Sequence, residues 1–202
     1  MKKIVYTGLM LLALASCKKQ GCTDPTALNY NQHAQQDDGS CNYNQQENIL
    51  PLIIDSDMTL TNDVIWQLQG RTSVTYGTTL TIQSGTVIKG DAGAGANASA
   101  LIIARGAKIM AQGTADQPII FTSIADDIQP GQRHGSTLSS TINGLWGGVI
   151  VLGNAPISAA NDTWQIEGIP ASDANGLYGG TAVTDDSGVL SYVSIRHGGA
   201  NI

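Results

Sequence analysis

The chain reads TLTIQSGTVIK from Thr79 to Lys89 and ALIIARGAKIM from Ala100 to Met110, and this repetition decides the fold. Each stretch reads as a short apolar strand, a turn that contains glycine, and a second short strand. Self-similarity at a fixed period of about 20 residues is typical of solenoids. The two stretches align at an offset of 21 residues, which superposes Leu80 on Leu101, Ile82 on Ile103, Gly85 on Gly106 and Ile88 on Ile109.

A coil of about twenty residues, with three short strands separated by turns, is what a parallel β-helix requires. Inward Leu, Ile and Val side chains then stack on their counterparts one coil later, and glycine serves corners that need a positive φ. An antiparallel sandwich also contains many short strands, but it would not predict repetition at a fixed offset. The pattern therefore predicts an all-β chain folded as a parallel β-helix over residues 49–202.

Later coils are less regular. A further strand is expected at Pro118–Thr122, and two more coils at Gly144–Ile157 and Gly188–Gly199. Two long polar insertions, Asp126–Asn143 and Ser158–Ser187, interrupt them. Insertions on a solenoid fall on corners and often form the binding face, so we expect the two to cluster on one face.

Several motifs in this region resemble the β-helix of large surface or outer-membrane proteins of Bacteroidetes. They read TLTIQSGTVIKG, AKIMAQGTADQPIIFTS, GLWGGVIVLGNAPI and GVLSYVSIRHGGANI, and the resemblance covers about residues 58–202. It implies a right-handed parallel β-helix in the cell envelope, with no established catalytic set. Such proteins usually continue for several more coils, so we expect the β-helix to be incomplete at its C-terminal end.

The N-terminal sequence predicts where the protein is located. Residues 1–16 have a short positive start, an apolar run and a small-residue cleavage site, which is the layout of a secretory signal peptide. The stretch Leu14–Cys17 resembles the lipobox of bacterial lipoproteins, which implies lipidation of Cys17 and a membrane anchor in residues 17–21. We expect an outer-membrane location. The residues Lys18, Lys19 and Gln20 favour its periplasmic face but leave the external face open.

The cysteine count agrees with lipidation. The chain has three cysteines, and if lipid occupies Cys17, then Cys22 and Cys41 remain for one disulfide in an oxidising compartment. Such a disulfide would stabilise the fold by about 3 kcal/mol. A structural zinc site fits less well, because only His33 lies between these cysteines and no CxxC pair exists.

Residues 22–43 are expected to form a small module framed by these cysteines, followed by a polar linker at residues 44–48. They resemble the short GCTDPTAxNYNxxAxxDDGSCxY module of secreted bacterial proteins. Its acidic and amide side chains could supply oxygen ligands to calcium, although their spacing departs from a regular calcium loop. The alternative interpretation is that they form Asx-turns and caps. The residues concerned are Asp24, Asn29, Asn31, Asp37 and Asp38.

Composition narrows the function classes. The formal net charge is −6, and removing Lys2 and Lys3 with the signal peptide changes it to −8. The basic residues beyond Lys19 are scattered singly, so the sequence lacks the footprint of a nucleic-acid-binding protein. Low charge with abundant Gly, Thr, Ser and Asn is typical of an extracellular β protein. Those basic residues are Arg71, Lys89, Arg105, Lys108, Arg133 and Arg196.

Candidate catalytic residues lie in or near the insertions. Glycoside hydrolysis needs two carboxylates across a cleft, and the candidates are the adjacent pairs Asp126–Asp127 and Asp185–Asp186. The pairs Arg133–His134 and Arg196–His197 could serve as base or cation in lyase chemistry. Turn formation, solvated charge and structural roles explain all four pairs better.

Three aromatic residues complete the set. Trp146, between Leu145 and Gly147, is interpreted as core or corner packing. Trp164 and Tyr178, in loop context, are candidate contacts for sugar rings. The leading hypothesis is a non-catalytic envelope lipoprotein whose β-helix displays a binding, adhesion or structural surface to glycan or protein partners. The alternative is a β-helix enzyme that degrades polysaccharide, either a lyase or a glycoside hydrolase. No cofactor other than calcium is expected.

Overall fold

The computed structural model describes residues 18–25, 27, 29–41 and 48–202, in two compact units divided between Gln45 and Gln46. The proposed signal peptide, Cys17 and residues 42–47 of the module and linker lie outside the described residues. Within the described part of the chain, no helix is long and apolar enough to cross a membrane.

The N-terminal unit is held by the predicted disulfide. Cys22 and Cys41 are bonded, with their Cα atoms 4.7 Å apart, and Cys22 is fully buried. A parallel bridge joins Gln20 to Gln36, and the Gly21 N–H donates to the Gln36 carbonyl at 3.2 Å. The disulfide therefore supplies the cross-link for a segment with almost no apolar core.

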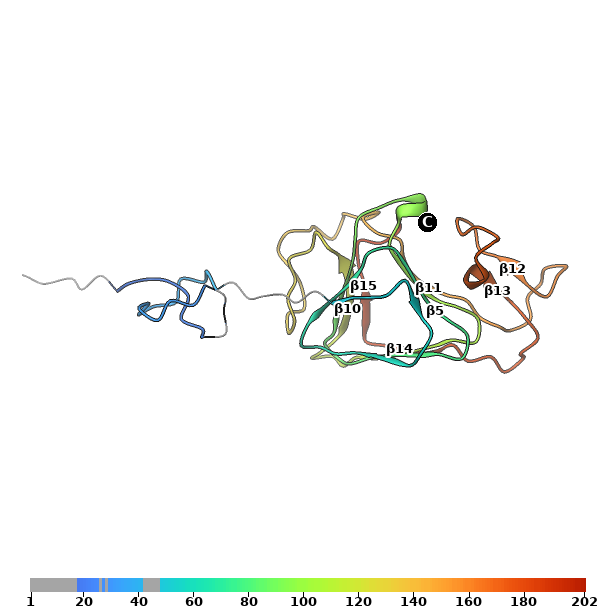
Figure 1. Ribbon diagram of the computed structural model, residues 1–202, viewed down its shortest axis with the longest axis horizontal. Helices are drawn as coiled ribbons and strands as arrows, with labels where there is room; N and C mark the ends of the chain where they lie inside the picture. Colours follow the sequence, from blue (N-terminus) through green and yellow to red (C-terminus); the bar gives the residue numbers. More distant parts are fainter. Residues whose placement is uncertain (1–17, 26, 28, 42–47) are drawn as a thin grey trace, which may run out of the picture. The chain divides into compact units, whose positions relative to one another are not determined.

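The second unit is a parallel β-helix, which confirms the predicted fold class. Its chain winds through three parallel sheets in turn, so that each sheet receives one strand per coil (Figure 1). The first sheet contains β1 (Asn48–Ile49), β4 (Ile65–Leu68), β7 (Val87–Gly90), β10 (Ile119–Ser123) and β15 (Val193–Ile195). The second contains β2 (Ile53–Ile54), β5 (Arg71–Val74), β8 (Ala100–Ile103) and β11 (Gly148–Val151). The third contains β3 (Met58–Leu60), β6 (Thr79–Ile82), β9 (Lys108–Gln112) and β14 (Gly188–Ser191).

Inward side chains form one apolar core along the helix axis. In each sheet, a residue of one coil pairs with its counterpart in the next, and both are buried. The second sheet stacks Ile54, Val74 and Ile103 in this way. The third stacks Leu60, Ile82 and Ala111. Each stacked side chain is covered by the coil before it and by the coil after it, and is thereby removed from water. Neighbouring coils therefore stabilise one another.

The predicted register of 21 residues is wrong, although the fold is right. Leu80 pairs with Ile109, 29 positions later, and Leu101 pairs with Thr72. The two matching stretches therefore lie on different sides of the coil, β6 to β7 and β8 to β9. The unit that repeats in the sequence is a strand, a corner and a second strand. The offset of 21 residues therefore spans two sides of a coil, whereas a full coil has three.

Glycine marks three of the corners, as predicted. Gly77, Gly85 and Gly106 have φ of 82°, 82° and 69°, where a side chain is strained. Each is the third residue of a turn closed by the same hydrogen bond, such as Ala107 N–H to the Ala104 carbonyl at 3.0 Å. A four-residue turn with positive φ at this position requires glycine.

The two insertions do not cluster on one face, in contrast to the expectation. Residues 124–147 follow β10, and their Ile128 covers the outward side chains Val87 and Ile120 of the first sheet. Residues 152–187 follow β11 and cover Ile102 of the second sheet with Leu152 and Ile169. The insertions thus lie on different sides of the β-helix, as their yellow and orange ribbons show in Figure 1. The position of each insertion is therefore decided by the outward apolar residues that it covers, and not by its corner alone.

The 3₁₀ helix η1 (Gly95–Asn97) lies between β7 and β8. The second insertion contains β12 (Trp164–Gln165), the 3₁₀ helix η2 (Ala174–Gly176) and β13 (Leu177–Tyr178). β12 and β13 pair antiparallel.

Leu80→Ala should lower the free energy of unfolding by about 2–5 kcal/mol, because Leu80 is fully buried in the stacked core and truncation leaves a cavity. The matched control is Leu52→Ala, whose side chain is 57% exposed and should matter by less than about 0.5 kcal/mol. Urea unfolding followed by circular dichroism measures both. Equal losses in the two variants would contradict the inward register of β6.

Candidate functional site

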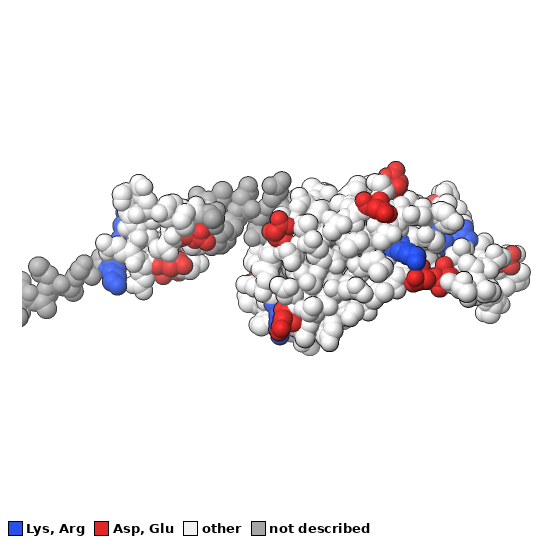
Figure 2. Space-filling view, turned by 90° about the horizontal axis from the view of Figure 1, so that it is seen from below, with Lys and Arg blue, Asp and Glu red and all other residues white. Residues whose placement is uncertain are grey.

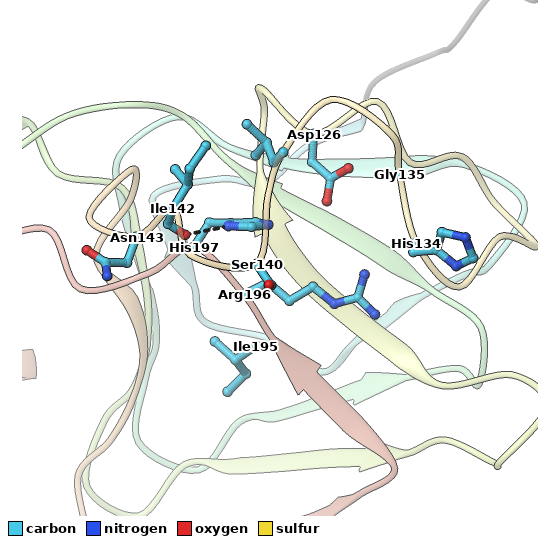
Figure 3. A pocket seen from close by; sticks show the side chains of 10 residues that line it. Asp126, His134, Gly135, Ser140, Ile142, Asn143, Ile195, Arg196 and His197 are labelled. Atoms are coloured by element: carbon cyan, nitrogen blue, oxygen red, sulfur yellow. Dashed lines mark hydrogen bonds between the residues drawn. The ribbon is translucent and has the colours of Figure 1, made fainter.

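A cavity of about 470 Å³ lies between the first insertion and the last strand of the first sheet (Figure 3). The insertion contributes most of the wall and β15, with the residues after it, contributes the rest. Four residues that the sequence offered as members of three separate pairs meet here. The lining residues are Asp126, His134, Gly135, Leu138, Ser140, Ile142, Asn143, Ile195, Arg196 and His197.

Asp126 fastens the start of the insertion to the sheet. It is 3% exposed, and its carboxylate accepts hydrogen bonds from Thr122 Oγ1 at 2.8 Å and from the Ile128 N–H at 3.2 Å. Its backbone carbonyl accepts one from the buried Lys89 Nζ at 2.8 Å. Thr122 and Lys89 are neighbours in β10 and β7. Since Asp126 is engaged in this way, it serves as structure on the cavity wall.

The Arg196 guanidinium is held from two sides. Its Nε donates to Ser194 Oγ at 2.9 Å and its Nη2 donates to the Arg133 carbonyl at 2.6 Å. Among the described residues, Nη1 has no hydrogen-bond partner. Figure 3 shows the guanidinium, which follows β15, extending toward the side of the cavity on which His134 lies. A planar cation fixed in this way is prepared to bind an anion without losing much side-chain entropy.

His197 is fixed in one tautomer. Its backbone has φ of 58°, which is unusual for a residue other than glycine. Its Nδ1 lies 2.7 Å from the Ile142 carbonyl, which accepts only, so Nδ1 carries a proton. In the neutral imidazole, Nε2 is then left as an acceptor or base.

Trp146 holds the backbone at Arg196 from the core side. It is fully buried, and its Nε1 donates to the Arg196 carbonyl at 2.8 Å. A side chain at Gly90 would lie 2.6 Å from the indole, so glycine is required there. The interpretation of Trp146 as core packing is confirmed, and the residue also positions the end of β15.

The remaining candidate carboxylates are engaged by other groups. Asp127 accepts from Ser136 Oγ at 2.6 Å. Its hydrogen bonds from Ser136 and from Thr137 lower the pKa of Asp127 to about 2. Asp185 accepts from the Asn154 N–H at 2.7 Å. Asp186 accepts from Lys108 Nζ at 2.9 Å, which holds the pKa of Asp186 below its usual range. The adjacent acids have separate hydrogen-bond partners.

Arg133 is also engaged, since its Nη2 pairs with Asp116 Oδ1 at 2.8 Å. It contributes its carbonyl, and not its charge, to Arg196.

Trp164 and Tyr178, the candidate sugar contacts, are directly paired across β12 and β13. Directly opposite residues project on the same face of a sheet. Trp164 is 51% exposed, whereas Tyr178 packs partly against the cluster of Ile102, Leu152 and Ile169. The structure thus brings the two aromatics together, with Trp164 the more accessible.

Three of the five residues considered for calcium form local turns. Asp37 Oδ1 accepts the Gly39 N–H and Asp38 Oδ1 accepts the Ser40 N–H, both at 3.0 Å. The Asn31 side chain accepts the His33 N–H at 3.0 Å. These contacts are Asx-turns. No three His, Cys, Asp or Glu side chains of the described ranges are grouped to hold a metal ion. Calcium binding by Asp24, Asp37 and Asp38 stays a prediction.

Residues 52–202 match the family model described as a pectate-lyase-like beta helix domain. The chain belongs to this family. No curated protein and no solved structure matches it. The pectate-lyase-like domain covers every strand from β2 onward and both insertions.

Sequence reasoning named Asp126, His134, Arg196 and His197 but missed their convergence. It also missed Thr122 and Lys89, which anchor the insertion beneath the cavity. The available signal was a lysine and a threonine on otherwise apolar buried strands, where a polar residue needs a partner.

Lowering the pH should loosen the segment of the first insertion around Ser136 and Thr137, because Asp127 accepts their hydrogen bonds. Its folded pKa is depressed, so its contribution is present above the ordinary value near pH 4 and is lost as the pH falls toward about 2. Asp127→Asn should show the released loop already at neutral pH. Nuclear magnetic resonance of the Ser136 and Thr137 amides measures both. Amide signals that do not change between about pH 4 and pH 2 would contradict the assignment.

Proposed function

We propose that this protein is a lipid-anchored envelope protein that binds acidic polysaccharide in the cavity beside β15. The Arg196 guanidinium is the observation that carries the proposal. Two protein acceptors hold it in place, while Nη1 has no partner among the described residues. Guanidinium groups bind carboxylates through two parallel hydrogen bonds, which suits the carboxylate of a uronic acid.

The charge of the cavity differs from that of its surroundings. Residues 48–202 contain twelve Asp and Glu but six Lys and Arg. On the face shown in Figure 2, the basic side chains form no continuous patch. The cavity nevertheless gathers Arg196, His134 and His197 around a single acid, Asp126, which is buried and hydrogen-bonded. A fixed guanidinium on an otherwise acidic protein favours a specific anionic ligand over general adhesion to anions.

Family membership supports the same substrate class, since pectate is an acidic polysaccharide. The exposed Trp164 beside Tyr178 offers a second contact surface for the glycan, on the other insertion. Aromatic rings of this kind combine an apolar face with a polar edge.

The anchor is proposed from the sequence alone. The lipobox-like stretch ending at Cys17 supports lipidation, and the disulfide at Cys22–Cys41 is consistent with an oxidising compartment. A lipid at Cys17 would anchor the protein to the outer membrane, on either its periplasmic or its external face. Metabolic labelling with a fatty acid, lost in Cys17→Ser, tests this part separately.

Arg196→Gln should weaken binding of polygalacturonate about tenfold or more, because it removes a charge-assisted hydrogen bond worth about 1.5–3 kcal/mol. The matched control is Arg71→Gln. It removes the same charge from a residue whose Nη1 donates to the Gly168 carbonyl in the other insertion. Isothermal titration calorimetry with polygalacturonate, and with uncharged dextran for comparison, measures both variants.

Two results would count against the proposal. One is wild-type affinity in Arg196→Gln, and the other is equal weakening in the Arg71 control.

The geometry of His197 favours a second candidate function, a lyase that acts by β-elimination. Nε2 would take the proton from the carbon next to the uronate carboxylate, which Arg196 neutralises. The electron pair left behind forms the ring double bond while the glycosidic carbon–oxygen bond breaks. The leaving oxygen takes a proton from solvent.

His197→Asn tests the lyase candidate, because asparagine tolerates the positive φ and still donates to the Ile142 carbonyl. If the wild type releases unsaturated product from polygalacturonate, the variant should release it about a hundredfold more slowly while binding persists. The ultraviolet absorbance of the product measures the rate. A wild type that binds the polymer without releasing product would leave binding alone as the function.

A further inference from the structure

A second cavity, of about 240 Å³, lies at the corner between the second and third sheets. Three successive coils build it. The corner after β5 supplies Tyr76, the corner after β8 supplies Ala104 and Arg105, and the second insertion supplies Asn154, Ala174 and Asn175. The cavity is smaller than the 300–1,000 Å³ typical of sites for drug-sized ligands, and it has room for one sugar ring.

Tyr76 forms an exposed aromatic wall of the cavity, and Gly106 supports its ring. Its side chain is 78% exposed, although its ring lies against the backbone of Gly106 on the next coil. A Cβ at Gly106 would lie 2.5 Å from the Tyr76 ring. The Gly77 N–H donates to the Gly106 carbonyl at 3.0 Å, which locks the two corners together. Gly106 therefore supports one part of the ring while most of its surface stays open to solvent.

Hydrogen bonds hold the side chain of Arg105 and the backbones of Asn154 and Asn175 at this cavity. Arg105 Nη1 donates to the Gly179 carbonyl at 2.9 Å. The Asn154 N–H donates to Asp185, and the Asn175 N–H donates to Asp173 Oδ1 at 3.0 Å. Within the described chain, the side-chain amides of Asn154 and Asn175 have no hydrogen-bond partner. Their backbones are thus fixed, while their side-chain amides are available to a ligand.

We propose that this cavity binds a pyranose unit of a neutral glycan. Axial C–H bonds make one face of a β-linked glucose or galactose apolar, and that face matches the open Tyr76 ring. Two amides and one guanidinium supply both donors and acceptors, which hydroxyl groups need and a simple anion does not. With one cation between two neutral amides, the cavity differs in chemistry from the pocket around Arg196. It also belongs to the other insertion, so the inference goes beyond acidic polysaccharide binding.

The probes are unbranched hexasaccharides of β-linked glucose and of β-linked galactose, titrated into the full chain by calorimetry. At least one should bind, and Tyr76→Ala should weaken it about tenfold or more. Tyr76→Phe should keep most of the affinity, because it keeps the ring face. Asn175→Ala should weaken binding as well, since it removes an amide that no other described residue engages. Tyr30→Ala removes an exposed tyrosine of the other unit and should change nothing.

The same variants separate this inference from the function proposed above. Tyr76→Ala should leave polygalacturonate binding intact, and Arg196→Gln should leave hexasaccharide binding intact. The inference is overturned if neither hexasaccharide binds at millimolar concentration, if Tyr76→Ala binds as the wild type does, or if only Arg196→Gln abolishes binding. Circular dichroism of each variant confirms that a loss of affinity is not a loss of fold.

Discussion

Direct stacking of apolar side chains from one coil onto the next is the interaction on which the rest of the structure depends. Trp66, Ile88 and Phe121 occupy successive coils of the first sheet in direct register. Similar columns in the other two sheets complete one continuous core. Because a parallel strand pair fixes the register of both strands, each buried column also fixes the height of the corners beside it. Every loop therefore leaves the β-helix at a defined place.

The insertions add a second constraint, which acts on the outer surface. A residue that faces outward from a solenoid is normally exposed, yet Val87, Ile120 and Ile102 are buried. Each insertion packs on such residues. Hydrogen bonds at Asp126, including the one from Lys89, then hold the first insertion in position. The cavity beside β15 follows from this packing, since its lining comes from the insertion and from Ile195, Arg196 and His197. The binding surfaces thus depend on outward burial, while the fold depends on inward burial.

Much of the fold was predictable because it is local. Strand, glycine corner and strand recur as one unit, and the turn that joins them needs positive φ at its third residue. The register was not predictable from the same pattern, because all three sides of a coil use similar units. Leu80 and Leu101 look equivalent in sequence but belong to different sheets. The loop of residues 91–99 lengthens one side and shifts the true pairing to 29 positions.

The sequence by itself determined the β-helix, the glycine corners and the Cys22–Cys41 disulfide, because each rests on short-range pattern or on residue arithmetic. The tertiary structure alone decided which sides carry the insertions and which residues meet. Arg196 reaches the carbonyl of Arg133, 63 residues earlier, only because β15 pairs with β10 and the insertion folds back beside it. Tyr76 and Asn154 share a cavity for the same reason, since three coils stack one corner above another. No local pattern encodes such contacts, because they depend on the total length of chain between successive strands of a sheet.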